Sequence, residues 1–239
     1  MVRRLPIVVL ACAALVAGAA FAASAFPDTR EAPAPAARVP AAPPPGEGAP
    51  VTVEAEPPPA APGIRWRRSR ALGTPEDGRL LRGIRLPAEG SDYFTWDPIH
   101  SRSPNRAWRR HGSDRLVRVL LRALAGYAHE HPGAPRVGIG DLSRPRGGDF
   151  GPRYGIVGHA SHQNGLDADL YHPRRDGRER PALLVADMDR RLAQDLVDAL
   201  VRAGASEILV GPSTGLRGPR SVVREAAGHD NHLHVRVAG

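Results

Sequence analysis

Two stretches of the chain carry apolar residues at helical spacing. In the first, residues 113–131, apolar side chains recur every three or four positions, Ser113 suits the N-cap, and Pro132 and Gly133 end the pattern. The second spans residues 187–203, has leucines at four-residue spacing, and stops at Gly204. The sequence therefore predicts two amphipathic helices.

Shorter segments alternate apolar and polar residues with a period of two, which is typical of strands. They lie at residues 136–140, 166–171, 207–210 and 232–237. In the segment 166–171, Leu166, Ala168 and Leu170 share one face, and Asp167 and Asp169 share the other. Two helices among several short strands predict an α+β fold: a compact single domain with a small antiparallel sheet that carries the functional site and is flanked by helices.

The first 25 residues predict export. Arg3 and Arg4 precede a long apolar run, and small residues suitable for signal cleavage follow it. The run is also long enough to span a bilayer, so residues 1–25 are either a signal peptide or an N-terminal membrane anchor. Both readings place the protein in the periplasm, in the cell envelope or outside the cell.

Residues 26–63 are rich in proline and alanine, and predict a disordered linker. Twelve of the 25 prolines fall in this segment, which has too few large apolar residues to form a core. Proline-rich chains of this kind act as extended spacers. The folded domain is therefore expected to comprise residues 64–239.

The charge of the chain favours anionic partners. The 33 basic residues against 25 acidic ones give a net charge of +8, with arginines clustered at residues 65–70 and at Arg144 and Arg146. Such a balance suits polyanions in general, including nucleic acid, an anionic membrane and anionic wall polymers, and does not choose among them. The export segment and the lack of interleaved aromatic residues argue against nucleic acid, so contact with anionic wall polymers is one possibility. The single cysteine, Cys12, excludes an intramolecular disulfide and a cysteine-type zinc site.

Six of the ten histidines lie between residues 159 and 234, and some of them can converge on a metal ion. His162 precedes the predicted strand that carries Asp169, across a turn that contains Gly165. His234 lies on the polar face of the last predicted strand. Zinc accepts imidazole and carboxylate ligands, and three of them leave a fourth position for water, which is typical of a catalytic site. We therefore predict a Zn²⁺ site at His162, Asp169 and His234.

His232 lies two residues before His234 on the same face of that strand. A strand rises about 3.3 Å per residue, so the two Cα atoms are about 7 Å apart. This spacing suits a proton-transfer group beside the metal. The site histidines thus fall in two groups, one within residues 158–169 and the other within residues 229–235. We interpret the remaining histidines as surface or boundary residues: His100, His111, His129, His131 and His172.

These histidine-rich stretches resemble those of the penicillin-insensitive murein endopeptidases, which belong to a zinc peptidase superfamily that also contains D-Ala-D-Ala metallo-carboxypeptidases. The matching stretches are 158–163, 165–169 and 232–236, and the likeness runs from about Arg67 to residue 239. The resemblance implies that His162, Asp169 and His234 bind zinc and that His232 is the catalytic histidine. It also points to His159, which we assign to the metal set, and to His229, which we assign to the catalytic set.

The resemblance implies hydrolysis of the peptide cross-links of peptidoglycan between D-Ala and a diamino acid. A carboxypeptidase that trims terminal D-Ala remains an alternative, because the sequence does not show whether the cleft is open at both ends. A non-catalytic wall-binding module is the third alternative, although the complete ligand set and His232 argue against it. The chain lacks a His-Glu-x-x-His motif, which excludes the thermolysin-type arrangement. The sequence leaves the oligomeric state open.

Overall fold

The computed structural model describes residues 63–154 and 158–239. The predicted signal peptide or membrane anchor (1–25) and the predicted linker (26–63, apart from Gly63) lie outside the described residues. Among the residues described, no helix combines the length and the apolar character needed to cross a bilayer.

The described residues contain ten strands, two α-helices and three short 3-10 turns. The strands are β1 (Arg70–Gly73), β2 (Gly78–Leu81), β3 (Ile84–Arg85), β4 (Tyr93–Thr95), β5 (His111–Gly112), β6 (Val137–Ile139), β7 (Asp167–Tyr171), β8 (Glu207–Val210), β9 (Val223–Glu225) and β10 (His232–Arg236). The helices are α1 (Asp114–Glu130) and α2 (Arg190–Ala203), and the 3-10 turns are Ala107–Arg109, Pro152–Tyr154 and Val185–Asp187.

Six strands form a central mixed sheet in the order β4-β6-β7-β10-β8-β9, and two small sheets pair β1 with β2 and β3 with β5. The inner strands β6, β7, β10 and β8 pair antiparallel. The edge strands β4 and β9 pair in parallel with their neighbours. The predicted α+β fold is confirmed, whereas the sheet, which was predicted to be antiparallel, is mixed. The parallel edges were not predicted, because the edge strands β4 and β9 were not among the segments recognised as strands in the sequence, and alternation does not reveal the direction of pairing.

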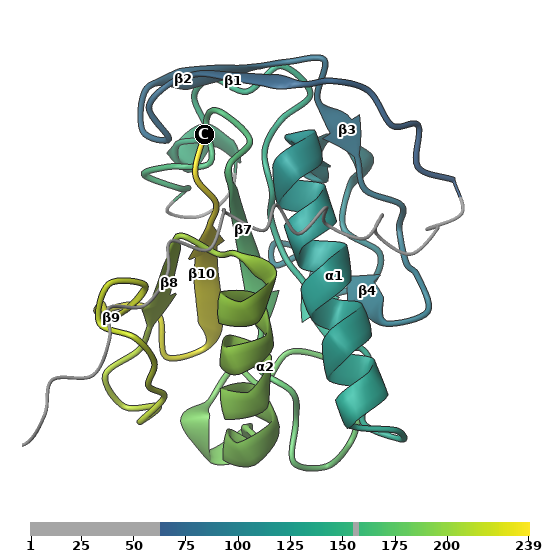
Figure 1. Cartoon of the computed structure of the whole chain (residues 1–239), viewed down its shortest axis with the longest axis vertical. Helices are drawn as coiled ribbons and strands as arrows, with labels where there is room; N and C mark the ends of the chain where they lie inside the picture. The colour runs from purple at the N-terminus through teal and green to yellow at the C-terminus, as the bar shows by residue number, and fades with distance from the viewer. Residues whose placement is uncertain (1–62, 155–157) are drawn as a thin grey trace, which may run out of the picture. The chain divides into compact units, whose positions relative to one another are not determined.

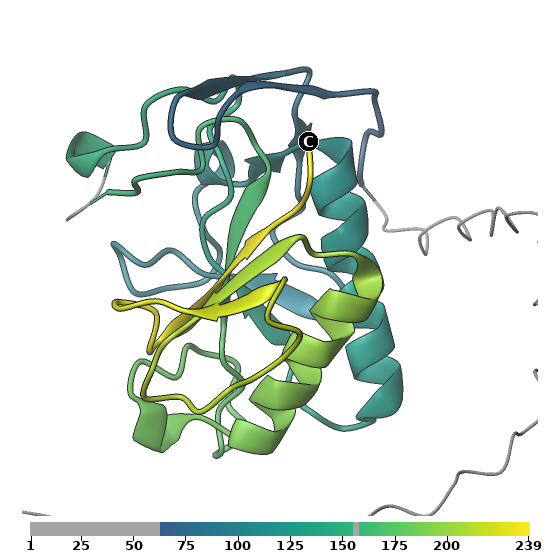
Figure 2. The same ribbon diagram turned by 60° about the vertical axis from the view of Figure 1, so that its left-hand side comes forward.

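Helices α1 and α2 pack against each other and cover one face of the central sheet (Figures 1 and 2). The side chain of Ser113 accepts a hydrogen bond from the N–H of Leu116, and that of Asp189 accepts one from Leu192, so each helix begins after a capping residue. Helix α2 ends at Gly204, whose φ of +99° is left-handed. Both predicted helices are confirmed, although α2 starts at Arg190 rather than at residue 187.

The core lies between the helices and the sheet. Leu124 of α1 and Leu200 of α2 are fully buried in one cluster with Leu233 and Val235 of β10. Burying a side chain of this size stabilises the fold by about 1.5–3 kcal/mol. Since alternate residues of a strand point to opposite faces, the helices hold one face of β10 and leave the other to polar side chains.

Candidate metal centre

Strands β7 and β10 lie side by side in the middle of the sheet and join distant parts of the sequence (Figure 1). In their antiparallel register His234 lies opposite Asp169, and Arg236 lies opposite Asp167. Opposite residues point to the same face of a sheet, so these side chains share the face that the helices leave free. The Nδ1 atom of His234 lies 3.3 Å from Oδ1 of Asp169.

His162 stands in the turn before β7 and is 1% exposed. Its φ of +69° is unusual for a residue other than glycine, and its backbone N–H donates to Oδ2 of Asp167 at 3.0 Å. Ring atom Nδ1 lies 2.7 Å from the carbonyl oxygen of Leu142, which can only accept, so Nδ1 carries the hydrogen. In the neutral ring Nε2 therefore holds the lone pair; it lies 3.3 Å from Oδ1 of Asp169 and has no hydrogen-bond partner among the described residues.

A second imidazole, that of His159, lies beside the first and faces the other oxygen of the same carboxylate. Its Nε2 lies 2.8 Å from Oδ2 of Asp141, and its Nδ1 lies 3.7 Å from Oδ2 of Asp169. Asp141 is 1% exposed and is held by Arg109, which donates through Nε to Oδ1 at 2.6 Å and through a terminal nitrogen to Oδ2. Asn105 adds a further hydrogen bond to Oδ1 at 2.9 Å. This network fixes the orientation of His159.

These side chains fit a metal ion. The ligand atoms of His159, His162 and Asp169 lie within 4.8 Å of one another. His234 extends this set, because its Nδ1 is close to Asp169 and its ring centroid is 5.0 Å from that of His162. A buried imidazole nitrogen without a partner is costly, and coordination would satisfy Nε2 of His162. Nitrogen and carboxylate ligands at this spacing suit zinc.

The electrostatics of this cluster favour a bound cation. Burial alone would raise the pKa of Asp169, but the influence of His162 and a hydrogen bond from His234 outweigh it and hold that pKa well below its usual range. Burial opposes protonation of His234, yet its bonds to Asp167 and Asp169 raise its pKa to about 9. Ligands must give up their protons to bind a metal, so we expect metal affinity to increase with pH.

His232 and His229 lie beside this cluster. Oδ1 of Asn231 accepts a hydrogen bond from Nδ1 of His232 at 2.7 Å, which leaves Nε2 facing Oδ1 of Asp169 at 3.8 Å. Burial lowers the pKa of His232, so its Nε2 has a free lone pair near neutral pH. The ring of His229 is 5.0 Å from that of His232, and its Nδ1 lies 3.0 Å from the carbonyl oxygen of Ala227.

All six predicted site residues line one open cleft of about 680 Å³: His159, His162, Asp169, His229, His232 and His234. Glu76, Tyr171, Glu207 and Arg224 also line it. A hollow of this size accommodates a peptide segment.

His172 differs from its prediction as a surface or boundary residue. It is 1% exposed, and neither ring nitrogen has a hydrogen-bond partner in the described part of the chain. Burial lowers its pKa to about 4. The reason lies in the strand period, since His172 comes two residues after the buried Leu170 and continues the core face of β7.

Three buried residues that orient the candidate site residues were not predicted from the sequence to belong to the site. Asp167 shares a face with Asp169, so the strand pattern contained its signal, and it accepts a hydrogen bond from Nε of Arg236 at 2.6 Å. Asp141 and Arg109 had no such signal. Their pairing joins residues 32 positions apart, which no local pattern connects.

Comparison with known proteins assigns the chain to a family. A family model described as penicillin-insensitive murein endopeptidase matches residues 71–208, which include His159, His162 and Asp169. A penicillin-insensitive murein endopeptidase of Haemophilus influenzae is 27% identical over 71% of this chain and 64% of its own length. The protein of the same name from Yersinia enterocolitica is 28% identical over 70% of this chain and 66% of its own length. The matched region thus spans slightly less than two thirds of these relatives.

Proposed function

Because the chain belongs to the penicillin-insensitive murein endopeptidase family, we propose that it is a zinc-dependent enzyme that hydrolyses the peptide cross-links of peptidoglycan, between D-Ala and a diamino acid. The relatives are named murein endopeptidases, which supports the substrate class and the type of reaction. A substrate in the cell wall also agrees with the export predicted from residues 1–25. The enzyme would then act in the periplasm, elsewhere in the envelope or outside the cell.

The observation that carries the proposal is the unpaired Nε2 of His162. It is buried beside Asp169, the carbonyl of Leu142 orients its ring, and a metal ion bound there would satisfy it. In this proposal His162, Asp169 and His234 hold the zinc ion, and His159 is a further ligand. Bound zinc would act as a Lewis acid on the scissile carbonyl and would acidify water.

The remaining residues of the cleft then have separate roles. His232 takes the proton from the attacking water through Nε2 and returns it to the leaving amine, while Asn231 keeps its Nδ1 protonated. His229, next to His232, assists at the same edge of the cleft. Asp141 and Asp167 position the imidazoles of His159 and His234.

One digestion separates the alternatives. Purified peptidoglycan is incubated with the zinc-loaded full chain, and the fragments are identified by mass spectrometry. Conversion of cross-linked dimers to monomers supports an endopeptidase. Release of free D-Ala alone supports a carboxypeptidase, and intact peptidoglycan supports a non-catalytic module.

The metal is tested separately. Elemental analysis of the purified chain should find about one zinc ion per molecule, since three or four protein ligands form one site. His162→Ala should abolish both zinc binding and hydrolysis. Absence of zinc after reconstitution of the wild type would contradict the proposal.

A further inference from the structure

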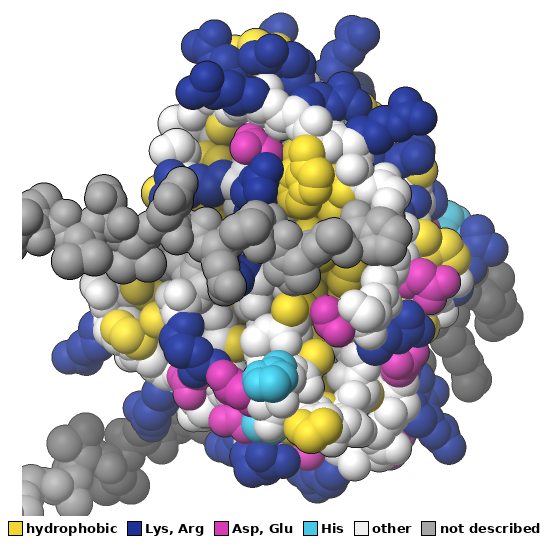
Figure 3. All heavy atoms as spheres, turned by 45° about the vertical axis from the view of Figure 1, so that its right-hand side comes forward, with side chains coloured by type: hydrophobic (Ala, Val, Ile, Leu, Met, Phe, Trp, Pro, Cys, Tyr) yellow, Lys and Arg dark blue, Asp and Glu magenta, His cyan; other side chains and the backbone are white. Residues whose placement is uncertain are grey.

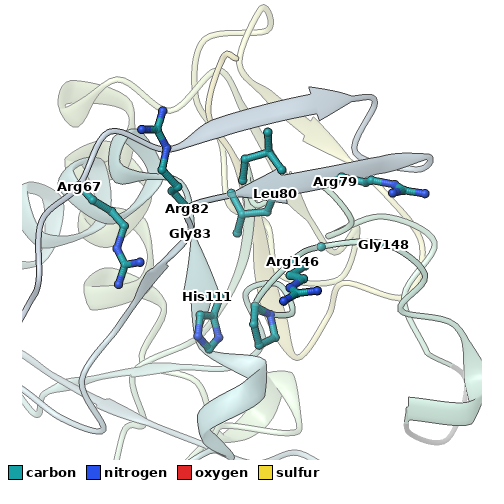
Figure 4. A pocket seen from close by; sticks show the side chains of 11 residues that line it. Arg67, Arg79, Leu80, Arg82, Gly83, His111, Arg146 and Gly148 are labelled. Atoms are coloured by element: carbon teal, nitrogen blue, oxygen red, sulfur yellow. The ribbon is translucent and has the colours of Figure 1, made fainter.

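A second hollow lies away from the histidine cleft and is lined with arginine. It measures about 620 Å³ and is formed by β2 and by the loop after β6. Four arginines, Arg67, Arg79, Arg82 and Arg146, line it, and the described residues around it include no aspartate or glutamate. Figure 4 shows Arg67 and Arg146 on either side of His111, and Figure 3 shows basic side chains gathered at the end of the molecule where Figure 1 places β1 and β2.

The type of cation is informative. All 33 basic residues of the chain are arginine. A guanidinium group presents a planar fork of donors that matches a phosphate or carboxylate group in two-point contact. None of the four arginines forms an ion pair with a carboxylate in the residues that the structure describes. Their donors therefore face the hollow or the solvent, and a concave surface lined with one sign of charge concentrates counter-ions.

The backbone around the hollow is held in place. The N–H of Leu80 donates to the carbonyl of Arg146 at 3.0 Å, and the N–H of Gly148 lies 3.0 Å from the carbonyl of Gly78. Gly147 has a φ of +67°, and a Cβ atom there would lie 2.0 Å from the carbonyl oxygen of Gln163. The loop and β2 are thus fastened together, and a preformed site loses less entropy when it binds a ligand.

His111 at the base of the hollow reflects the same positive surroundings. Its Nδ1 is buried and has no hydrogen-bond partner among the residues described. Burial lowers the pKa of His111 to about 4, and the charges of Arg85, Arg110 and Arg67 act in the same direction. The imidazole is therefore neutral at physiological pH and does not add to the repulsion among the arginines.

The shape of the basic surface favours a chain with repeated charges. A neighbouring hollow of about 590 Å³ shares Arg67, Gly83 and His111 with the first and adds Arg65 and Arg85. Two adjoining basic hollows can hold successive anionic groups of one chain. Leu81, which is 42% exposed, and Pro145 provide apolar contact for the uncharged units between such groups.

We propose that these two hollows bind an anionic polymer of the cell wall, a flexible glycan or polyol chain that bears phosphate or carboxylate groups. A membrane surface fits less well, because the arginines surround concave surfaces and Leu81 is the only exposed large hydrophobic residue beside them in the described part of the chain. The loop beside the first hollow is linked to the segment that carries His162, because Gly148 donates to the carbonyl of Gln163 at 2.8 Å and Gln163 directly follows His162.

A polymer bound in the two hollows would hold the enzyme near the wall. This consequence rests on the proposed function, whereas the binding of the polymer does not.

Binding is measured by fluorescence anisotropy with the full chain. The labelled probes are poly(glycerol phosphate), polygalacturonate and neutral dextran. We expect the two anionic probes to bind, more weakly as salt increases, and dextran not to bind. Sedimentation with vesicles of equal parts phosphatidylglycerol and phosphatidylcholine provides the membrane arm. Binding to vesicles but not to the polymers would overturn the proposal, as would no binding to either.

A matched pair of variants separates a site from overall charge. The first changes Arg67, Arg79, Arg82 and Arg146 to Gln. The second changes Arg122, Arg180, Arg217 and Arg220, which are also exposed and form no ion pair with a described residue, so each variant loses four positive charges. The first should lose at least about tenfold in polymer affinity and the second about twofold or less. Equal losses of polymer affinity in both variants would show that binding depends on net charge alone and would overturn the proposed site.

Folding and metal loading provide the control for these variants. The eight arginine side chains are exposed, so both variants should unfold at nearly the temperature of the wild type and bind the same amount of zinc. The single variant Arg82→Gln gives a second test, since its side chain contacts no other described residue by hydrogen bond. It should lose about threefold in affinity. An unchanged polymer affinity, both in Arg82→Gln and in the variant of Arg67, Arg79, Arg82 and Arg146, would overturn the proposal.

Discussion

Asp141 holds His159 through a 2.8 Å hydrogen bond between Oδ2 of the carboxylate and Nε2 of the ring. A carboxylate can only accept, so Nε2 carries the hydrogen, and in the neutral ring that would bind a metal Nδ1 holds the lone pair, 3.7 Å from Oδ2 of Asp169. Arg109 donates a hydrogen bond to each oxygen of the Asp141 carboxylate. A buried ion pair thus sets the tautomer of an imidazole that reaches the candidate metal centre.

We expect Asp141→Asn to weaken zinc binding by about 10- to 100-fold, because the loss of such a partner loosens the orientation of a ligand. Competition with a chromophoric chelator measures this affinity directly. Asp97→Asn is the control, because Asp97 is also fully buried and pairs with a histidine and an arginine, His100 and Arg106, but does not line the cleft. Equal zinc affinity in the two variants would mean that Asp141 supports only the fold.

His232→Ala should keep its zinc and lose about 10²–10⁴-fold in kcat, the usual contribution of a proton-transfer group. His234→Ala should lose the metal, because Nδ1 of His234 is 3.3 Å from Asp169 whereas Nε2 of His232 is 3.8 Å away. Zinc content and turnover are measured on both. Complete loss of zinc from His232→Ala would reverse the two assignments.

The stability of the fold should decrease in mild acid because of His172. Its pKa is lowered to about 4 in the folded chain, whereas an exposed histidine titrates near 6.5. Between these values the unfolded chain binds a proton that the folded chain does not, so the free energy of unfolding falls with decreasing pH, by up to about 3 kcal/mol. Urea titrations from neutral pH to pH 4 should show a flatter profile for His172→Gln. His129→Gln, at an exposed position of α1, should follow the wild type.

Leu124→Ala should destabilise the domain by about 2–5 kcal/mol, because Leu124 is fully buried between α1 and the rest of the core. Leu183→Ala removes the same atoms from a side chain that is 59% exposed, and should change the free energy of unfolding by about 0.5 kcal/mol or less. Chemical denaturation of both variants checks the difference. Similar losses would contradict the position of the core.

Residues 1–63 should be dispensable for hydrolysis in vitro. The start of the domain is fastened to α1 within the described residues, where Ser69 and Asp114 exchange hydrogen bonds and Arg118 lies over the ring of Trp66 at 4.3 Å. Residues 64–239 and a chain that starts at Phe26 should therefore have equal specific activity on soluble cross-linked peptides. A large loss in the shorter chain would show that the linker contributes to the site.

The sequence predicted the parts of this fold that local patterns determine. The capping side chain of Ser113, the left-handed Gly204 and the alternation through β7 and β10 each act within a few residues, and the structure confirms the elements that they define. The shared polar face of β7 and β10 is also what allowed His162, Asp169 and His234 to be grouped. The pairing of Arg109 with Asp141 depends on the packing of separate elements, and the three-residue strands β4 and β9 take their conformation from their neighbours.

The position of β10 has a consequence for when activity can arise. It follows both β7 and β8 in sequence, yet it lies between them in the sheet and carries both His232 and His234. A chain that emerges from its N-terminus presents β7 and β8 with open edges until β10 arrives, and pairing across such a separation forms late. The candidate metal centre is therefore complete only after β10 has paired with both neighbours. A nascent chain that still lacks β10 would be without it, so the proposed hydrolase would gain its activity only after the sheet has closed.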